Sequence, residues 1–226
     1  MTGNIAQRIA IDGPVGAGKT TVGREVAKRL GYGFLDTGLM YRALTRAALD
    51  RGVAFDDEAA MVELARDPRI AVKFDEAGEA RVEIDGVDAT ARLRTPKVDQ
   101  GVPVVAAIAG GRRVLVARQK EIAAEAPIVM VGRDIGTVVL VEADLKVFLT
   151  ASVEERARRR HFELKHAGTA IGYEAVLESL KRRDEMDTDR AASPLRPADD
   201  SRLVDTDGLN LEQVVEKVFK LVEAAG

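Results

Sequence analysis

Short apolar segments recur along the chain, and stretches in which apolar residues have helical spacing separate them. Segments of this length, bounded by turn residues, are typical of strands buried on both faces of a parallel sheet. Because such strands alternate with helices, we predict an α/β fold, with a doubly wound parallel sheet and helices on both faces. The apolar segments occupy residues 8–12, 34–37, 128–132, 145–150 and 202–206.

One stretch between the second and third of these segments has a different period. Apolar and polar residues alternate on both sides of the sequence DEAGE at residues 75–79, within residues 70–86. An alternation with period two around a glycine-containing turn predicts a β-hairpin. We therefore expect a small antiparallel insertion in the parallel fold.

Residues that commonly begin or end helices mark several boundaries. Val22, Val26 and Leu30 follow one another at a spacing of four, and Gly31 predicts where that helix ends. Ser152, with Glu155 three residues later, predicts a capping box at another helix N-terminus. The last helix is predicted from about Asn210, with an apolar face formed by Leu211, Val214, Val215, Val218, Leu221 and Val222.

The most informative stretch is the glycine-rich sequence GPVGAGKTT, which lies between the first apolar segment and the first helix. Glycines allow successive backbone N–H groups to face one concavity that binds an anion, and the following helix N-terminus adds to that attraction. In this motif the lysine ammonium binds the β- and γ-phosphates, and the threonine hydroxyl binds Mg²⁺. An ordinary glycine-rich turn is the lesser alternative. We predict a nucleoside-triphosphate site at Gly13, Pro14, Val15, Gly16, Ala17, Gly18, Lys19, Thr20 and Thr21.

Composition narrows the chemistry that accompanies this site. The chain has 226 residues, 46% hydrophobic and 31% charged, and its net charge of −3 gives no general attraction to nucleic acid or anionic membrane. Without cysteine and with two histidines, thiolate catalysis, disulfides and histidine-based metal sites are not expected. The N-terminus lacks a signal-peptide pattern, and no segment has the roughly 18 apolar residues of a membrane span. We expect a cytoplasmic protein with neither nucleic-acid nor membrane partners.

Switch GTPases, nucleic-acid or mechanochemical ATPases and small-molecule kinases all use such a loop. The guanine-binding N-K-x-D motif is absent, since Asn4 and Asn210 are the only asparagines and neither precedes a lysine. No strand ends in the D-E pair of helicase-like ATPases, so a small kinase is favoured. Kinases need guanidinium groups around the transferring phosphate, and Arg42 and Arg133 follow strand ends, where α/β sheets bind ligands.

Four stretches, IDGPVGAGKTTVGREVAKRLGYGFLDTGLMYRALT, VGRDIGTVV, FLTASVEERARRR and RRDEMDTDRAASPL, resemble bacterial cytidylate kinases, and the likeness extends in the same order from Ile9 to about Val218. The resemblance implies transfer of the γ-phosphate of ATP to CMP or dCMP, with ATP and Mg²⁺ as cofactors and Thr20 beside the metal. It also implies a core of residues 1–36 and 127–226 that includes a helical lid at about 154–175. Residues 37–126 would form a monophosphate-binding region, with the hairpin insertion at about 69–93.

The resemblance also assigns roles to individual side chains. Cytosine has an amino donor at N4 and acceptors at N3 and O2, so Asp134 would accept from N4 and Arg112 would donate to the acceptors. Catalysis is assigned to Lys19, Arg133, Arg156, Arg160 and Arg190, and of these Arg156 and Arg160 would cover ATP. The residues matched to the substrate are Arg42, Arg133 and Arg190 for the CMP phosphate, Arg183 and Asp187 for the sugar, and Thr37, Arg112 and Asp134 for the base.

Three positions depart from the family pattern. Val131 stands where the family usually has a carboxylate that helps to order Mg²⁺, and Pro103 stands where it has a serine that contacts the nucleoside. Gly110 and Gly111 precede Arg112 in place of a proline-containing approach, and we expect them to add backbone freedom there. The cytosine preference is therefore supported by fewer matched residues than the kinase activity.

Other interpretations stay open at this point. Asp134 alternatively caps a helix, and residues 156–160 alternatively form a solvated helix face. The chain alternatively phosphorylates another monophosphate or a small metabolite, or is an ATP-binding regulatory module with little turnover. We favour a monomeric cytidylate kinase without a general base or covalent intermediate, because a monophosphate oxygen is already ionised near neutral pH.

Overall fold

The computed structural model describes residues 6–166, 168, 170–190 and 193–225. The chain divides into two compact units, residues 1–26 with 131–226 (unit 1) and residues 27–130 (unit 2). Residues 167 and 169 of the predicted lid lie outside the described residues, as do residues 191 and 192 of the proline-containing stretch after it.

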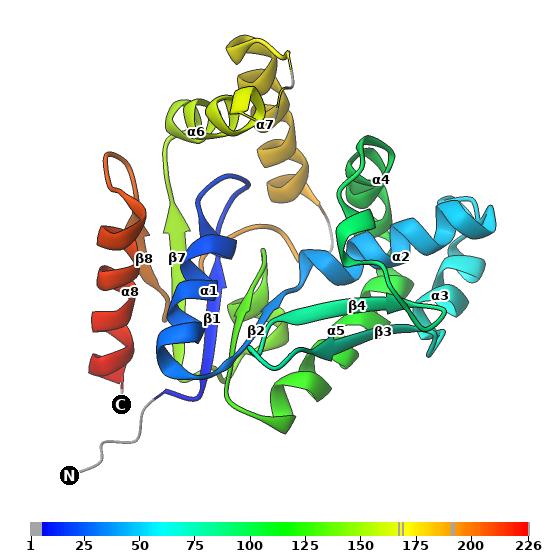
Figure 1. The fold of residues 1–226 in the computed structure, drawn as a ribbon, viewed down its shortest axis with the longest axis horizontal. Coiled ribbons are helices and arrows are strands. Elements are labelled where there is room, and N and C mark those ends of the chain that lie inside the picture. The colour runs from blue at the N-terminus through cyan, green and yellow to red at the C-terminus, as the bar shows by residue number, and fades with distance from the viewer. Residues whose placement is uncertain (1–5, 167, 169, 191–192, 226) are drawn as a thin grey trace. The chain divides into compact units, whose positions relative to one another are not determined.

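The apolar segments form a five-stranded sheet with the order β2-β6-β1-β7-β8 (Figure 1). Strands β1 and β7 are parallel, with Ile9 opposite Leu145, and β7 and β8 are parallel, with Val147 opposite Arg202. The predicted α/β fold with a parallel sheet is therefore confirmed. The strands are β1 (Arg8–Asp12), β2 (Gly33–Asp36), β6 (Ile128–Val131), β7 (Leu145–Thr150) and β8 (Arg202–Asp205).

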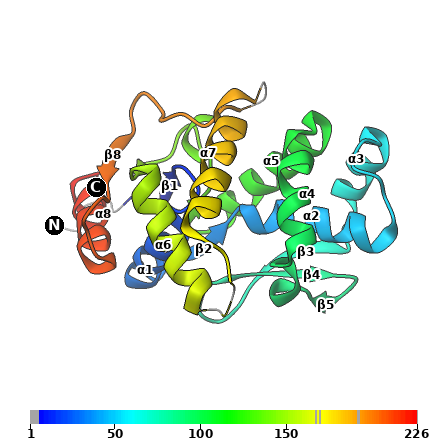
Figure 2. The same ribbon diagram turned by 90° about the horizontal axis from the view of Figure 1, so that it is seen from above.

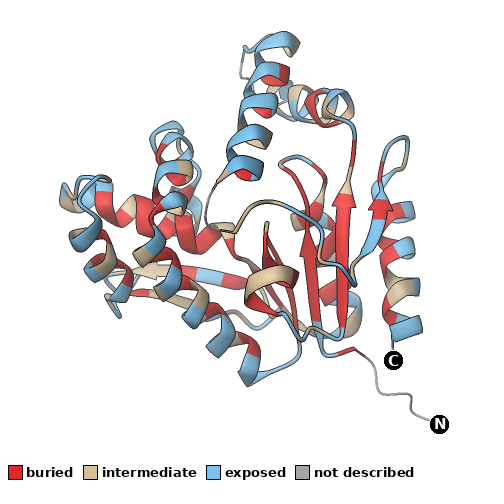
Figure 3. Ribbon diagram, turned by 180° about the vertical axis from the view of Figure 1, so that it is seen from behind, coloured by how far each residue is buried: buried red, intermediate tan, exposed pale blue. Residues whose placement is uncertain are grey.

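Unit 1 surrounds the strands β1, β7 and β8 with helices. Both β1 and β7 are buried along nearly their whole length (Figure 3), as continuous apolar segments require. Helix α8 packs against β7 and β8, while α6 and α7 pack against each other (Figure 2) around Ala157, Val176 and Leu180. The helices here are α1 (Lys19–Leu30), the π-helix η2 (Ile135–Val139), α6 (Val153–His166), α7 (Tyr173–Asp189) and α8 (Leu211–Ala225).

The predicted helix ends are confirmed in part. Gly31 follows α1 with a φ of 69°, which glycine adopts readily. The Ser152 hydroxyl accepts from the Glu155 N–H at 3.3 Å, but the Glu155 carboxylate binds arginines of α6 instead of completing the capping box. On α8 the side chains at 214, 215, 218 and 222 are buried as predicted. The expectation for Leu211 is wrong, because it is 46% exposed in the first turn of the helix.

Unit 2 contains the predicted hairpin with a third strand that the sequence did not indicate. Strands β3 (Ile70–Phe74) and β4 (Ala80–Ile84) pair antiparallel with Val72 opposite Val82, and β5 (Val87–Asp88) adds to β4. The small antiparallel insertion is therefore confirmed. The helices of unit 2 are α2 (Gly38–Arg51), α3 (Glu58–Arg66), the 3₁₀ helix η1 (Thr90–Leu93), α4 (Pro96–Ala107) and α5 (Ala109–Glu125).

Gly101 allows α4 to pack closely on α2. A Cβ atom at this position would lie 2.7 Å from Thr45 Cγ2 and 2.8 Å from the Phe55 ring, and the Thr45 side chain is fully buried. We predict that Gly101→Ala lowers the free energy of unfolding by about 1–3 kcal/mol through overpacking, despite the better helix propensity of alanine. Urea denaturation followed by circular dichroism measures this change.

Gly111→Ala is the matched control, because a Cβ there would meet its nearest neighbour, Leu44, at an ordinary 3.8 Å. This helical glycine of the same unit should tolerate alanine or gain stability. Equal stability of the two variants would show that the α2–α4 contact does not depend on the missing side chain.

Candidate active site

At three positions, the glycine-rich loop of unit 1 has backbone dihedral angles that only glycine adopts readily. Gly13, Gly16 and Gly18 have φ values of 147°, 80° and 89°. A Cβ on Gly13 would lie 2.1 Å from the Leu149 carbonyl oxygen of β7, so the loop passes directly against the neighbouring strand. The predicted order of strand, loop and helix is present, since β1 ends at Asp12 and α1 begins at Lys19. The loop therefore has the curvature that an anion-binding concavity requires.

The Lys19 ammonium lies against this loop. Its Nζ donates to the Pro14 carbonyl oxygen at 2.7 Å, and the residue is only 7% exposed. Thr20 follows as the second residue of α1, at the helix N-terminus where backbone N–H groups attract anions. The motif thus combines a fixed cation, a hydroxyl and a helix N-terminus in one short segment.

Asp12 connects the end of β1 to the segment that follows β6. Its carboxylate oxygens accept from the backbone N–H groups of Ile135 at 2.8 Å and Gly136 at 2.7 Å. Burial raises the pKa of Asp12 to about 6; the two amide donors oppose the shift, the Asp134 charge adds to it and Lys19 opposes it. Neither this contact nor the helix η2 has a signal in the sequence pattern, because Asp12 and the two amides are 123 and 124 residues apart.

Five of the predicted substrate residues form one cluster in unit 1. Arg133 Nε donates to Asp187 Oδ2 at 2.8 Å, Arg183 Nε lies 3.7 Å from Asp187 Oδ1, and Arg190 lies 4.0 Å from Asp134 Oδ1. Desolvation would raise the pKa of Asp187, but the charges of Arg133, Arg183 and Arg190 outweigh it and hold that pKa below its usual value. The cluster therefore concentrates guanidinium groups around two carboxylates, of which Asp187 is held in its ionised form.

Arg156 contacts both the loop and α7. It is 4% exposed, and its guanidinium forms two bonds to Asp184, of 3.1 and 2.6 Å. It also donates to the carbonyl oxygens of Val15 at 3.0 Å and Ala151 at 3.1 Å. A solvated helix face is therefore the wrong description of Arg156, although it fits Arg160, which is exposed and pairs with its neighbour Glu163.

Unit 2 carries the remaining predicted residues on α2 and α5. Thr37 is buried at the N-terminus of α2, and Arg42 donates to Asp99 Oδ1 at 2.5 Å and to the Leu93 carbonyl oxygen at 3.2 Å. Arg112 is buried, with its guanidinium carbon 5.6 Å from the centre of the Tyr41 ring, within range of a cation–π interaction.

The three departures from the family pattern occupy regular structure. Val131 is buried as the last residue of β6, and Pro103 lies inside α4. The expectation that Gly110 and Gly111 add backbone freedom is wrong, because both belong to the first turn of α5. A Cβ on Gly110 would lie 2.4 Å from Val62 of α3, so close helix packing accounts for this glycine.

Sequence reasoning missed the carboxylates that hold the arginines. Asp184 binds Arg156 and Asp99 binds Arg42, across 28 and 57 residues of chain. A partial signal existed for the Arg183–Asp187 pair, which has the i,i+4 spacing of neighbours on one helix face. No such spacing relates Asp99 to Arg42.

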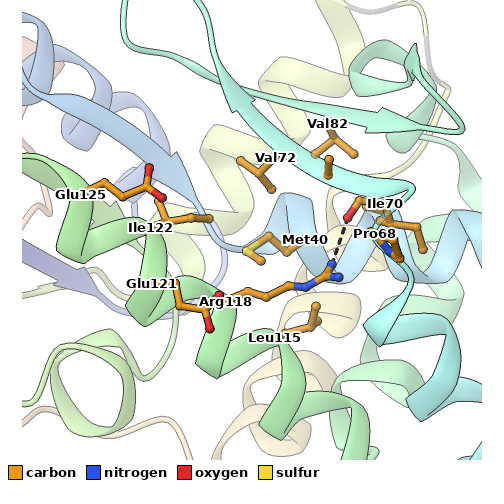
Figure 4. Close-up of a pocket in the computed structure, with 12 residues that line it drawn as sticks. Met40, Pro68, Ile70, Val72, Val82, Leu115, Arg118, Glu121, Ile122 and Glu125 are labelled. Atoms are coloured by element: carbon orange, nitrogen blue, oxygen red, sulfur yellow. Dashed lines mark hydrogen bonds between the residues drawn. The ribbon is translucent and has the colours of Figure 1, made fainter.

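A cavity of about 230 Å³ in unit 2 is separate from these residues. Figure 4 shows its apolar wall, which includes Met40, Val72 and Leu115, and the Arg118 side chain that crosses it to the Ile70 carbonyl oxygen. Arg118 donates to two further carbonyl oxygens, those of residues 66 and 67. None of the predicted site residues lines this cavity.

The described residues contain neither a cluster of metal-ligating side chains nor a membrane-spanning helix. Within that part of the chain no group of three or more histidine or acidic side chains could hold a metal ion. None of the described helices is long and apolar enough to cross a membrane.

A family model and similar curated proteins all point to one family. A family model described as cytidylate kinase matches residues 9–224. A cytidylate kinase of Caldanaerobacter subterraneus subsp. tengcongensis is 48% identical over 219 residues, which cover 97% of this chain and 96% of that protein. A cytidylate kinase of Bacillus licheniformis is 45% identical, with 95% of both chains covered.

Solved structures show a likeness of fold alone. The crystal structure of an uncharacterized protein from Eubacterium ventriosum has a TM-score of 0.52 and 14% sequence identity, and the match covers 96% of this chain and 98% of that one.

Removal of Asp184 tests the ion pair that holds Arg156. We predict that Asp184→Ala lowers the free energy of unfolding by about 2–3 kcal/mol, because it leaves a buried guanidinium without its carboxylate. Urea denaturation measures the change. Glu163→Ala is the control, since it removes the partner of the exposed Arg160 and should alter stability by no more than about 0.5 kcal/mol. Similar losses in both variants would contradict a structural role specific to Asp184.

Proposed function

The chain belongs to the cytidylate kinase family, and from this premise we propose that it transfers the γ-phosphate of Mg·ATP to CMP or dCMP, giving ADP and CDP or dCDP. The observation that carries the proposal is the cluster of Arg133, Arg183 and Arg190 around Asp187 and Asp134, in the same unit as the glycine-rich loop. A phosphorylated acceptor with a polar base suits such a cluster better than an uncharged metabolite does.

ATP is assigned to residues 13–21. The loop N–H groups and the α1 N-terminus would bind its phosphates, and Lys19 would exchange its Pro14 partner for phosphate oxygens. The Thr20 hydroxyl and the ATP phosphates would hold Mg²⁺, which favours oxygen ligands, keeps several waters and would neutralise charge on the phosphates. Hydroxyl and phosphate oxygens are a suitable donor set for this ion.

CMP is assigned to three groups of side chains, one each for its phosphate, its sugar and its base. Arg42, Arg133 and Arg190 bind its phosphate, for which the planar guanidinium is well matched. Asp187 remains ionised and accepts from sugar hydroxyls, with Arg183 beside it. Thr37, Arg112 and Asp134 bind the base, where Asp134 accepts from the cytosine amino group and a uracil carbonyl would be repelled.

The transfer needs positioning and charge stabilisation more than proton transfer. An ionised phosphate oxygen of CMP attacks the γ-phosphorus, a new P–O bond forms, and the bond to the β,γ-bridging oxygen breaks to release ADP. Lys19, Arg133, Arg156, Arg160 and Arg190 stabilise the charge on the transferring group. No general base is required.

The same proposal includes the roles of the two regions of the chain, the cellular location, the oligomeric state and the partners. Residues 1–36 and 127–226 act as the ATP-binding core with a lid at about 154–175, and residues 37–126 act as the monophosphate-binding region. The protein works as a cytoplasmic monomer on small nucleotides. Its acidic net charge of −3 is consistent with the absence of nucleic-acid partners.

ADP release from Mg·ATP, measured separately with CMP, dCMP, UMP, AMP, GMP and shikimate, tests the reaction. We expect rapid release with CMP and dCMP, and a fall in kcat of at least about 10²-fold in Lys19→Ala with the fold retained. Lys28→Ala, an exposed lysine of the same helix, is the control that should keep full activity. Release with a different acceptor only would refute the base assignment, and silence with ATP still bound would indicate a regulatory module.

The role of Asp134 is tested by the choice between two acceptors. We predict that Asp134→Ala narrows the ratio of kcat/KM for CMP over UMP by at least about 10-fold, because the group that distinguishes an amino donor from a carbonyl is removed. The ratio is obtained from initial rates at saturating ATP. An unchanged ratio would mean that another residue recognises the base.

A further inference from the structure

The N-terminus of η2 is capped by a residue from a distant part of the sequence. Asp134 occupies the N-cap position, where aspartate commonly accepts from the first helical N–H groups, but its side chain makes no capping hydrogen bond. The Asp12 carboxylate, 123 and 124 residues away along the chain, accepts from Ile135 and Gly136 instead. The helix-capping alternative for Asp134 is therefore wrong.

This arrangement is tightly enclosed. Asp12 and Asp134 are both about 95% buried, since each is 5% exposed. A Cβ on Gly136 would lie 3.1 Å from Lys146 Cδ and 3.4 Å from Asp12 Oδ2, so the turn is pressed against the carboxylate and the stem of Lys146. Two charge-assisted hydrogen bonds to successive amides fix both the position and the direction of the turn.

We propose that Asp12 is a positioning residue for recognition of the acceptor base: it caps η2 in place of Asp134, so that the Asp134 carboxylate is directed to the base of the nucleotide. The proposal deepens the function proposed above and rests on it. Because Arg133 and Asp134 immediately precede the two amides, the same contact also sets the backbone from which both substrate residues extend.

The surroundings of Asp12 do not make its charge a source of stability. Asp12 is desolvated and near the charge of Asp134, whereas Lys19 and the two amides favour its ionised form. The ionised form, however, is the one that accepts from both amides at once.

The test compares acceptors rather than absolute rates. Asp12→Asn keeps the size of the side chain but has one acceptor oxygen for two amides. We expect the ratio of kcat/KM for CMP over UMP, at saturating Mg·ATP, to narrow by about 10-fold. Both acceptors use the same ATP site and the same Lys19, so any effect of the substitution on those groups cancels in the ratio.

A double-mutant cycle identifies the route of the effect. If Asp12 acts through Asp134, then Asp12→Asn added to Asp134→Ala should change the ratio by less than about twofold. Asp144→Asn is the matched control, since the Asp144 carboxylate also accepts from two successive amides, those of Gln7 and Arg8. It should leave the ratio unchanged.

The outcomes separate the two proposals. A wild-type protein that does not phosphorylate CMP, or an Asp134→Ala variant with an unchanged ratio, refutes the proposed function or its base assignment. A ratio that changes in Asp134→Ala but not in Asp12→Asn, or that changes additively in the double variant, overturns the positioning role alone. If Asp12→Asn does not fold, Asp12→Ser, which also keeps one acceptor oxygen without the charge, is measured in the same cycle.

Discussion

Phosphoryl transfer requires positive charge to be gathered in one place, and the protein has to hold that charge before any phosphate binds. In unit 1, carboxylates fix two of the arginines that we propose for this role, with Arg133 held by Asp187 and Arg156 by Asp184. An ionised partner fixes the direction of a guanidinium and offsets repulsion among neighbouring cations. The arginines are thereby preorganised, while a nearly neutral net charge is kept over the whole protein.

The glycine-rich loop connects this charge to the fold. Gly13 passes against the Leu149 carbonyl, and a Cβ on Gly16 would lie 3.2 Å from Arg156 Cβ. The glycines therefore serve two requirements at once: the curvature that turns N–H groups inward and the close approach of β7 and α6. Since Arg156 also binds the Val15 carbonyl, the conformation of the loop and the position of α6 depend on each other.

Asp12 illustrates how function and stability oppose each other at such a site. Its pKa in the folded protein, about 6, lies above the ordinary value of 3.8, so the folded state binds the proton more tightly. The corresponding contribution to stability is present below pH 3.8 and is lost as the pH rises through about 6. At neutral pH the ionised carboxylate therefore stabilises the fold less than the protonated form would, yet it provides both acceptors for the start of η2.

The sequence by itself determined the local elements of this protein. The apolar segments predicted the five strands of the parallel sheet, and the period-two alternation predicted the hairpin. The apolar segment before the glycine-rich loop and the helical spacing of Val22, Val26 and Leu30 after it predicted the strand–loop–helix order. These features depend on residues only a few positions apart, so their pattern is visible in the chain.

Only the tertiary structure decided the partners of the charged residues. Arg156 meets the Val15 carbonyl 141 residues away, and Asp12 caps a helix whose own N-cap residue, Asp134, does not. The tertiary structure also explains Gly110, because this glycine allows α3 to approach closely and does not form a flexible turn. Charge and hydrogen bonding act through space, and spacing along the chain does not encode which buried groups the fold brings within 3 Å of one another.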